Sequence, residues 1–289
     1  MKPSSLRQTT SHRGCSLSWF IEGEGPPVMM IQGTGVGATG WRPQSEALSA
    51  RFRCLCFDNR GFGESQPFEG ELTVEAMAED ALALMDAQGW RSAHVMGHSL
   101  GGLVAQYVAG KVPSRVRSLS LLCTFPTGAI PTRLTPWVLA VGLRSQLGTR
   151  RMRRHAFLEM VLSPQELAHA DKDALAQRLS ELFGHDLADQ PPVVMRQFRA
   201  MRCGDATPFL RQLGGIPTLV VSASEDRIAP PYGGRALAEG IPGARYVEFP
   251  DAAHGVPIQQ AERVNALLLE HLTAAEARWM EPTQVSGAS

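Results

Sequence analysis

A serine between two glycines, at position 99, is the residue whose neighbours point most directly to chemistry. Gly97, Ser99 and Gly101 match the pattern G-x-S-x-G, between an apolar run, Ala93–Gly97, and a helix-like segment, Leu100–Gly110. In that context the serine occupies a strained strand-to-helix turn with its hydroxyl exposed, and the glycines avoid Cβ clashes. The helix N-terminus also directs partial positive charge at the hydroxyl. We therefore predict that Ser99 is a nucleophile; an ordinary glycine-rich turn with a capping serine is the alternative.

A serine hydroxyl becomes a good nucleophile only when a base removes its proton, and an acid must orient that base. Five histidines follow Ser99, and three of them lie in a stretch without convincing strands. His271 falls inside the last helix-like segment, where a surface position is expected. His254 instead comes directly after the apolar run that ends at Phe249, at the kind of strand end where ligand sites gather. The sequence therefore predicts that His254 is the base.

The orienting acid should also follow a strand, between the serine and the histidine in chain order. The apolar run Thr218–Ser222 leads into a loop with two adjacent carboxylates, Glu225 and Asp226. The loop after another predicted strand, Val116–Leu122, reads Cys-Thr-Phe and offers no carboxylate. We predict that Asp226 is the acid and keep Glu225 as the second candidate.

Attack on a carbonyl group creates an oxyanion, which needs N–H groups already in position. Leu100, the residue after the serine, is predicted to supply one backbone N–H. A glycine-rich loop, Gly33–Gly37, follows the apolar run Val28–Gln32, and Thr34 is predicted to supply the other. The loop lacks the lysine of a P-loop and the spacing of a dinucleotide motif, so we expect neither a nucleotide nor another cofactor.

Short apolar runs that alternate with helix-like segments must position these residues. The predicted strands are Val28–Gln32, Arg53–Asp58, Ala93–Gly97, Val116–Leu122, Thr218–Ser222 and Arg245–Phe249. The predicted helices of this pattern are Pro43–Ala50, Val74–Gln88, Leu100–Gly110 and Ile258–Ala277. Apolar residues in the second of these helices recur every 3.6 residues, and Thr73 is its predicted N-cap. Parallel strands joined by helices predict an α/β fold with a doubly wound, mostly parallel sheet.

A helical block interrupts this alternation and predicts an inserted cap. From about residue 124 to 205 there is helical periodicity, as in Ala156–Val161 and Ala174–Phe183, but no convincing strand. We therefore divide the chain into four parts. They are an N-terminal tail (1–15), a core (16–123 and 206–280), a cap (124–205) and a C-terminal tail (281–289) that is expected to be disordered.

Some residues of the cap and its surroundings could bear on the substrate. Trp137, in the apolar segment 134–143, could line a pocket, and so could Trp41, which follows the glycine-rich loop; both could equally be core residues. A basic run could attract an acidic substrate, although a solvated helix face is the favoured interpretation. This run consists of Arg150, Arg151, Arg153 and Arg154.

Composition narrows the class of protein. The chain has 289 residues, a formal net charge of +0 and a pI near 7.1, which argues against nucleic-acid binding. Cys54 and Cys56 have no second ligand pair nearby, so no metal is expected. The five cysteines are interpreted as buried free thiols of a reducing compartment. Because neither a secretory segment nor a membrane span is apparent, we expect a cytoplasmic protein without a membrane partner.

Taken together, the motifs resemble those of the α/β-hydrolase superfamily. The segment Val95–Gly102 resembles its nucleophile turn, and Asp58–Ser65 resembles its D-x-R-G-x-G-x-S loop, which would be structural. The loops around Asp226 and His254 resemble its acid and histidine segments. The chain is most similar to esterases, enol-lactonases, cofactor-free haloperoxidases and carbon–carbon bond hydrolases with a helical cap. It departs from the family at Gln32, where a histidine often precedes the glycine, so support of that loop is expected to differ.

The resemblance implies a serine hydrolase that acts on a small organic molecule. Relatives that hydrolyse haloalkanes or epoxides have an aspartate nucleophile, so Ser99 excludes their chemistry. The first expectation is cleavage of a carboxylic ester or lactone through an acyl-enzyme. Hydrolysis of a carbon–carbon bond in a diketone-like substrate, by the same triad, is a second possibility. A ligand receptor of the same fold is the third, because fold alone does not determine function.

Overall fold

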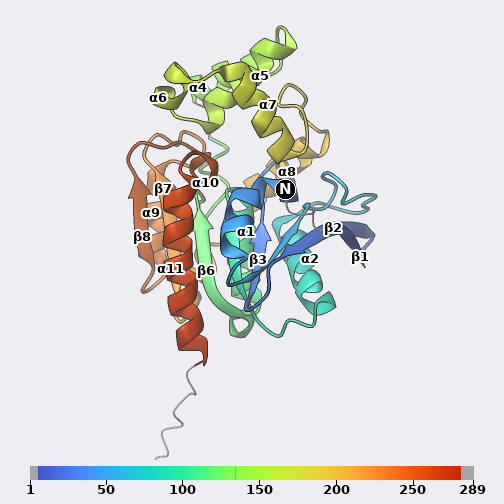
Figure 1. Cartoon of the computed structure of the whole chain (residues 1–289), viewed down its shortest axis with the longest axis vertical. Helices are drawn as coiled ribbons and strands as arrows, with labels where there is room; N and C mark the ends of the chain where they lie inside the picture. The colour runs from blue at the N-terminus through green and yellow to red at the C-terminus, as the bar shows by residue number, and fades with distance from the viewer. Residues whose placement is uncertain (1–5, 134, 281–289) are drawn as a thin grey trace, which may run out of the picture.

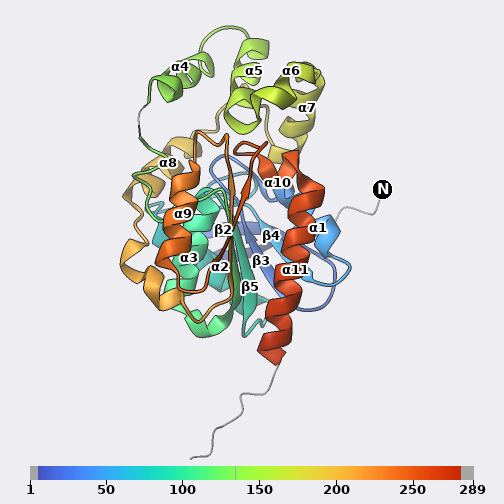
Figure 2. The same ribbon diagram turned by 90° about the vertical axis from the view of Figure 1, so that its left-hand side faces the viewer.

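The computed structural model describes residues 6–133 and 135–280, which form one central sheet, helices on both of its faces and a helical region beyond one end (Figures 1 and 2). The sheet has eight strands in the order β1-β2-β4-β3-β5-β6-β7-β8. All pairs from β4 to β8 are parallel, whereas β1 and β2 are antiparallel. The predicted doubly wound, mostly parallel α/β fold is therefore confirmed.

Six of the strands, β3 to β8, coincide closely with the predicted apolar runs, because parallel strands that are covered on both faces need continuous apolar sequence. Every residue of β7 is buried, for example. The strand bounds are β1 Gln8–His12, β2 Cys15–Glu22, β3 Pro27–Ile31, β4 Arg53–Phe57, β5 Ala93–His98, β6 Val116–Leu122, β7 Thr218–Ala223 and β8 Arg245–Phe249.

Two separate hydrophobic clusters cover the two faces of the sheet. Met29 and Ile31 of β3 pack in the cluster that contains α2 (Val74–Ala87), α3 (Leu100–Lys111) and α9 (Pro231–Gly240). The alternate residues, Val28 and Met30, pack in the cluster of α1 (Arg42–Leu48) and α11 (Ala261–Met280). Successive strand residues face opposite sides of the sheet, so both faces are covered by apolar side chains and excluded from water. The predicted N-cap of α2, Thr73, is confirmed, since its side chain accepts a hydrogen bond from the Ala76 N–H.

The edge of the sheet differs from the prediction. Residues 8–12, which we assigned to an N-terminal tail, form β1, and β2 was not predicted. β1 consists only of polar residues, and β2 begins with serines between apolar residues, so neither shows the continuous apolar run of the central strands. The last predicted helix is divided into α10 (Val256–Gln259) and α11. The proposed tail at 281–289 lies outside the described residues, as does Leu134 in the apolar segment 134–143.

The region between β6 and β7 is helical and stands above the carboxyl ends of the strands (Figure 1). An isolated bridge between Thr127 and Asp205 brings its two ends together. Leu158 and Leu179 belong to a separate hydrophobic cluster, whereas Met201 joins the main core. The helices are α4 (Pro136–Arg144), α5 (Arg150–Val161), α6 (Pro164–His169), α7 (Lys172–Phe183) and α8 (Val193–Cys203). Helix α8 therefore packs against the core, although its residues fall within the predicted cap, 124–205.

The D-x-R-G-x-G-x-S loop holds the core together near the site. Asp58 accepts hydrogen bonds from the Ala38 N–H at 2.6 Å and the Glu64 N–H at 3.0 Å. The Arg60 guanidinium makes two 2.6 Å hydrogen bonds to Asp80 on α2, and both side chains are at most 3% exposed. The loop therefore has a structural role, as the resemblance implied.

Replacing Asp80 by alanine is expected to destabilise the fold by about 3–5 kcal/mol, because it leaves the buried Arg60 charge unpaired. Urea unfolding followed by circular dichroism measures this change. Asp86 on the same helix pairs with Arg115 but is 64% exposed. Asp86→Ala should therefore cost less than about 1 kcal/mol. Equal effects of the two substitutions would contradict a special role for the buried pair.

The cysteines and the helices bear on two further expectations. Four cysteines are buried and free, as predicted, but Cys203 is exposed at the end of α8, so that part of the interpretation was wrong. The apolar face of α8 turns toward the core, which leaves its last residue at the surface.

Over the part of the chain that the structure describes, no helix is both long and apolar enough to cross a membrane.

Candidate active site

Ser99 lies on a sharp turn between β5 and α3. Its backbone has φ +54° and ψ −121°, a conformation that costs a side-chain-bearing residue about 1–3 kcal/mol. The turn needs its glycines, because a Cβ on Gly97 would lie 2.1 Å from the Gly101 carbonyl oxygen. A Cβ on Gly101 would lie 2.0 Å from the Ile31 carbonyl oxygen. The G-x-S-x-G segment thus adopts the strained strand-to-helix turn that its sequence indicated.

His254 and Asp226 are joined by a short hydrogen bond below the cap. His254 Nδ1 lies 2.7 Å from Asp226 Oδ2, and both residues are buried. The other carboxylate oxygen, Oδ1, accepts hydrogen bonds from the Ile228 and Ala229 N–H groups, each at 2.8 Å. These contacts hold the carboxylate in one orientation, with Oδ2 directed at the imidazole. Glu225, the second candidate acid, is exposed.

Sheet topology brings these loops to one edge. Ser99 follows β5, Asp226 follows β7 and His254 follows β8, and the carboxyl ends of parallel strands meet at the same edge. A direct contact ties the loops together, since His98 Nε2 lies 2.9 Å from the His254 carbonyl oxygen. The carbonyl can only accept, so Nε2 of His98 carries the proton. His98 therefore anchors the His254 loop beside Ser99, a role that the sequence motif did not reveal.

His98, which is partly buried, forms a cluster with the buried residues Cys123 and His254. Ligand atoms of the three residues lie within 4.8 Å of one another, close enough for a metal ion. Desolvation, followed by the nearby His254, lowers the pKa of His98 to about 3, so this imidazole stays neutral. Burial, followed by the charge of Asp226, raises the pKa of Cys123 well above its usual value. A protonated thiol is a poor nucleophile. One ring nitrogen of each histidine is already hydrogen-bonded, His98 Nε2 to the His254 carbonyl and His254 Nδ1 to Asp226.

The glycine-rich loop after β3 runs directly past Ser99. A Cβ on Gly33 would lie 3.0 Å from the Ser99 Cβ and 3.2 Å from the His98 carbonyl oxygen, so a side chain here would force its neighbours to shift. Gln32 supports the loop from within, because its Oε1 accepts from the Gly33 N–H at 3.1 Å. Asn59 Nδ2 donates to the Gln32 carbonyl at 2.9 Å. Thr34, one of the two predicted oxyanion donors, is the next residue of this loop and is half-buried, and Leu100, the other, directly follows Ser99 and is buried.

Residues from the cap complete the support of this loop. Gln197 Oε1 accepts from the Gly35 N–H, and His185 Nε2 donates to the Gly35 carbonyl, both at 2.9 Å. The Gly37 N–H donates to the Phe183 carbonyl at 3.0 Å. The cap also reaches the histidine loop, where the Gly255 N–H donates to the Val161 carbonyl at 2.6 Å. Partners so far apart in the chain leave no local signal, which explains why sequence reasoning missed Gln197 and His185.

The two predicted pocket residues lie in different surroundings. Trp41 is 1% exposed and packs in the core cluster of α1 and α11. Trp137 on α4 is half-buried, and the Arg227 guanidinium lies 5.1 Å from its ring centre. Because Arg227 adjoins Asp226, Trp137 links the cap to the acid loop. Trp137 therefore contacts a chain neighbour of the candidate acid, whereas Trp41 is a core residue.

The basic run of the cap is engaged in ion pairs. Arg150 and Arg154 both contact Asp186, and Arg151 contacts Asp173. The hydrogen bond from Arg154 is the main reason why the pKa of Asp186 lies well below its usual value. These pairs join α5 to α7 and the segment after it. They neutralise much of the charge, which favours the solvated, structural interpretation over attraction of an acidic substrate.

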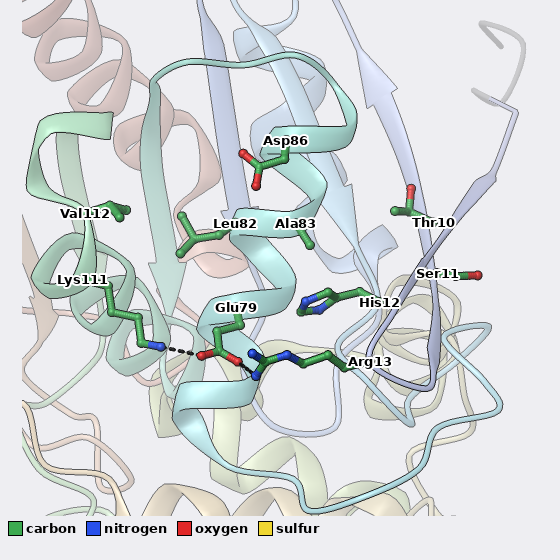
Figure 3. Close-up of a pocket in the computed structure, with 10 residues that line it drawn as sticks. All are labelled: Thr10, Ser11, His12, Arg13, Glu79, Leu82, Ala83, Asp86, Lys111 and Val112. Atoms are coloured by element: carbon green, nitrogen blue, oxygen red, sulfur yellow. Dashed lines mark hydrogen bonds and ion pairs between the residues drawn. The ribbon is translucent and has the colours of Figure 1, made fainter.

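A surface depression of about 620 Å³ lies away from the candidate triad, between β1, α2 and α3 (Figure 3). Glu79 reaches toward Lys111 and Arg13 across its floor, and the Lys111 Nζ to Glu79 Oε1 distance is 2.6 Å. Arg13 and Lys111 both pair with Glu79, and none of our predicted site residues lines this depression. It therefore has no part in the chemistry of the candidate triad.

Comparison with known proteins identifies the class that the fold and the site define. Residues 26–261 match the family described as alpha/beta hydrolase fold, and the chain belongs to this family. It is 29% identical over 269 residues to RutD of Azorhizobium caulinodans, which bears the name of a carbamate hydrolase; the match covers 90% of this chain and 96% of that protein. The chain is therefore an enzyme of the hydrolase type.

Two solved structures are similar along almost their whole length. The enol-lactonase from Burkholderia xenovorans LB400 has a TM-score of 0.77 and 27% identity, with 92% of this chain and 100% of that one covered. A thermophilic esterase from Thermogutta terrifontis has a TM-score of 0.75 and 28% identity, with coverage of 94% and 99%.

Proposed function

We propose that this protein is a serine hydrolase that cleaves a carboxylic ester or a lactone of a small organic substrate. The observation that carries the proposal is the Asp226–His254 pair, held at the sheet edge where Ser99 occupies its strained turn. The likeness to an enol-lactonase and to an esterase supports the same substrate class. A small-molecule substrate, without nucleic acid or membrane, is the partner that we propose.

The proposed mechanism follows from the histidine tautomer that the Asp226–His254 hydrogen bond favours. Nδ1 of His254 donates to Asp226, which leaves the Nε2 lone pair to accept the proton of the Ser99 hydroxyl. The Ser99 oxygen attacks the carbonyl carbon, and the backbone N–H groups of Leu100 and Thr34 stabilise the oxyanion. His254 then protonates the leaving alcohol. A water molecule, activated by the same imidazole, releases the acid and restores Ser99.

The cap is proposed to close over this chemistry and to exclude water. Ser99 and His254 are only 5% and 6% exposed. Residues 124–205 are the proposed cap, and 16–123 with 206–280 the proposed core. The free cysteines support a reducing compartment, and we propose the cytoplasm.

Hydrolysis of p-nitrophenyl esters of increasing acyl length, together with simple lactones, tests the proposed function. We expect turnover on at least one ester series, with a preferred chain length that reports the size of the pocket. A fluorophosphonate probe should label Ser99 and abolish this turnover. Labelling without ester or lactone turnover would contradict the substrate class and favour carbon–carbon bond hydrolysis. Neither labelling nor turnover would contradict a competent triad and favour a ligand receptor.

A further inference from the structure

A buried amide group against the loop that approaches the nucleophile has, among the residues that the structure describes, a hydrogen-bond partner for only one of its two polar atoms. Gln197 on α8 is 1% exposed, and its Oε1 accepts from the Gly35 N–H at 2.9 Å. Its Nε2 is also buried and has no hydrogen-bond partner among residues 6–133 and 135–280. The orientation of the amide is determined by chemistry, because the Gly35 N–H needs an acceptor and only the oxygen can be one. A desolvated NH₂ donor is thus left over.

A second buried polar atom without a described hydrogen-bond partner belongs to the same loop. Thr34 Oγ1 is buried and unpartnered within the described residues, and Thr34 directly precedes Gly35. The loop that contains Thr34 and Gly35 approaches Ser99 closely at Gly33. Two unpaired polar groups therefore lie along one short loop beside the nucleophile. Buried polar groups are normally paired, so a pair of exceptions at a site calls for a ligand or a bound water.

Support of the loop alone does not account for this arrangement. Anchoring the Gly35 N–H requires only an acceptor. The NH₂ group of the glutamine adds a desolvation cost that no hydrogen bond to a described residue offsets in the free protein. The group becomes useful if a substrate supplies an acceptor oxygen. The acyl group stays on Ser99 beside this loop in both halves of the proposed reaction, so the acyl group is the part of the substrate that can do so.

We propose that Gln197 Nε2, together with Thr34 Oγ1, recognises a carbonyl oxygen in the acyl portion of the substrate, beyond the scissile carbonyl. The enzyme would then select oxo-acyl esters or lactones over purely aliphatic ones. This inference rests on the proposed function and deepens it. Gln197 would be a specificity-determining residue, contributed to the site by the helix that also buttresses the core.

Matched ester pairs test the proposal. The p-nitrophenyl esters of 4-oxopentanoate and 4-methylpentanoate differ by an oxygen in place of a methyl group, as do those of 5-oxohexanoate and 5-methylhexanoate. For at least one pair, wild type should favour the oxo ester by about tenfold in kcat/KM, as expected for one hydrogen bond to a buried donor. A ratio near one for both pairs would overturn the proposal.

Substitution at position 197 shows which group is responsible for the ratio. Gln197→Glu keeps an oxygen for the Gly35 N–H but replaces the NH₂ donor by a carboxylate oxygen. We expect its oxo-to-methyl ratio to fall to one or below. Gln146→Glu makes the same change at an exposed position of the cap and should keep the wild-type ratio. A Gln197→Glu protein that loses rate on both esters but keeps their ratio would reduce Gln197 to a loop anchor and overturn the proposal.

Two further measurements keep the test decisive. If Gln197→Glu does not fold, as judged by circular dichroism, Thr34→Val removes the second group and should lower the ratio severalfold; an unchanged ratio would overturn the proposal. Binding of each ester pair to the Ser99→Ala protein, measured by calorimetry, does not require turnover. Preference for the oxo ester without wild-type hydrolysis would support recognition while the proposed function fails. Equal binding of both esters, with normal hydrolysis, would reject recognition and leave the proposed function intact.

Discussion

Ser99→Ala is expected to lower kcat on an active ester by about 10⁵–10⁶-fold, the scale at which a serine hydrolase loses its nucleophile. The hydroxyl is the only group of the proposed triad that forms a covalent bond with the substrate carbon. Its loss leaves only oxyanion stabilisation and substrate binding. The fold should survive, because alanine keeps the Cβ that the turn at φ +54° already accommodates. Steady-state hydrolysis by highly purified protein, with circular dichroism of the same sample, measures both effects.

Ser120→Ala is the matched control. Ser120 is a buried serine on β6 whose hydroxyl has no partner within the described residues, so its removal should leave hydrolysis and stability nearly unchanged. Residual activity of Ser99→Ala above a thousandth of the wild-type rate would contradict Ser99 as nucleophile. Fluorophosphonate labelling of Ser99→Ala would contradict it as well, since another residue would then carry the reactive hydroxyl.

Asp226→Asn is expected to lower kcat by about 10⁴-fold, as a triad acid does when it becomes an amide. The structure gives a specific reason. Oδ1 accepts from the Ile228 and Ala229 N–H groups, so an asparagine must place its oxygen there. Its NH₂ group would then face His254 Nδ1. That nitrogen would have to accept, which puts the proton on Nε2 and removes the lone pair that Ser99 needs.

Glu225→Gln is the control for this substitution, because it makes the same change at the adjacent, exposed carboxylate. We expect Glu225→Gln to retain the wild-type rate. Full activity of Asp226→Asn together with loss in Glu225→Gln would transfer the role of the acid to Glu225. Losses of similar size in both variants would mean that the loop conformation, and not the histidine tautomer, controls the rate. Steady-state kcat at one pH, with unfolding curves for both variants, separates these outcomes.

The central strands and the candidate triad could be predicted from local patterns for a physical reason. A strand buried on both faces, such as β7, needs an unbroken apolar run, and a strained turn such as that at Ser99 needs glycines on either side. The edge strand β1 was missed because all five of its residues are polar and none is fully buried, so no apolar pattern marks it. Its pairing with β2 comes from the partner strand and not from its own composition.

The sequence by itself determined the α/β class of the fold, the identity of the nucleophile candidate and the two loops that carry its partners. Only the tertiary structure distinguishes the two candidate acids, because it buries Asp226 beside His254 and exposes Glu225. It also revealed His98, Gln197 and His185 as supports of the site. Their partners lie 150 or more residues away in the chain, and hydrogen bonds at that separation depend on how the cap and the sheet pack together. No local pattern of residue types encodes such a contact, because it arises only when the distant segments have folded against each other.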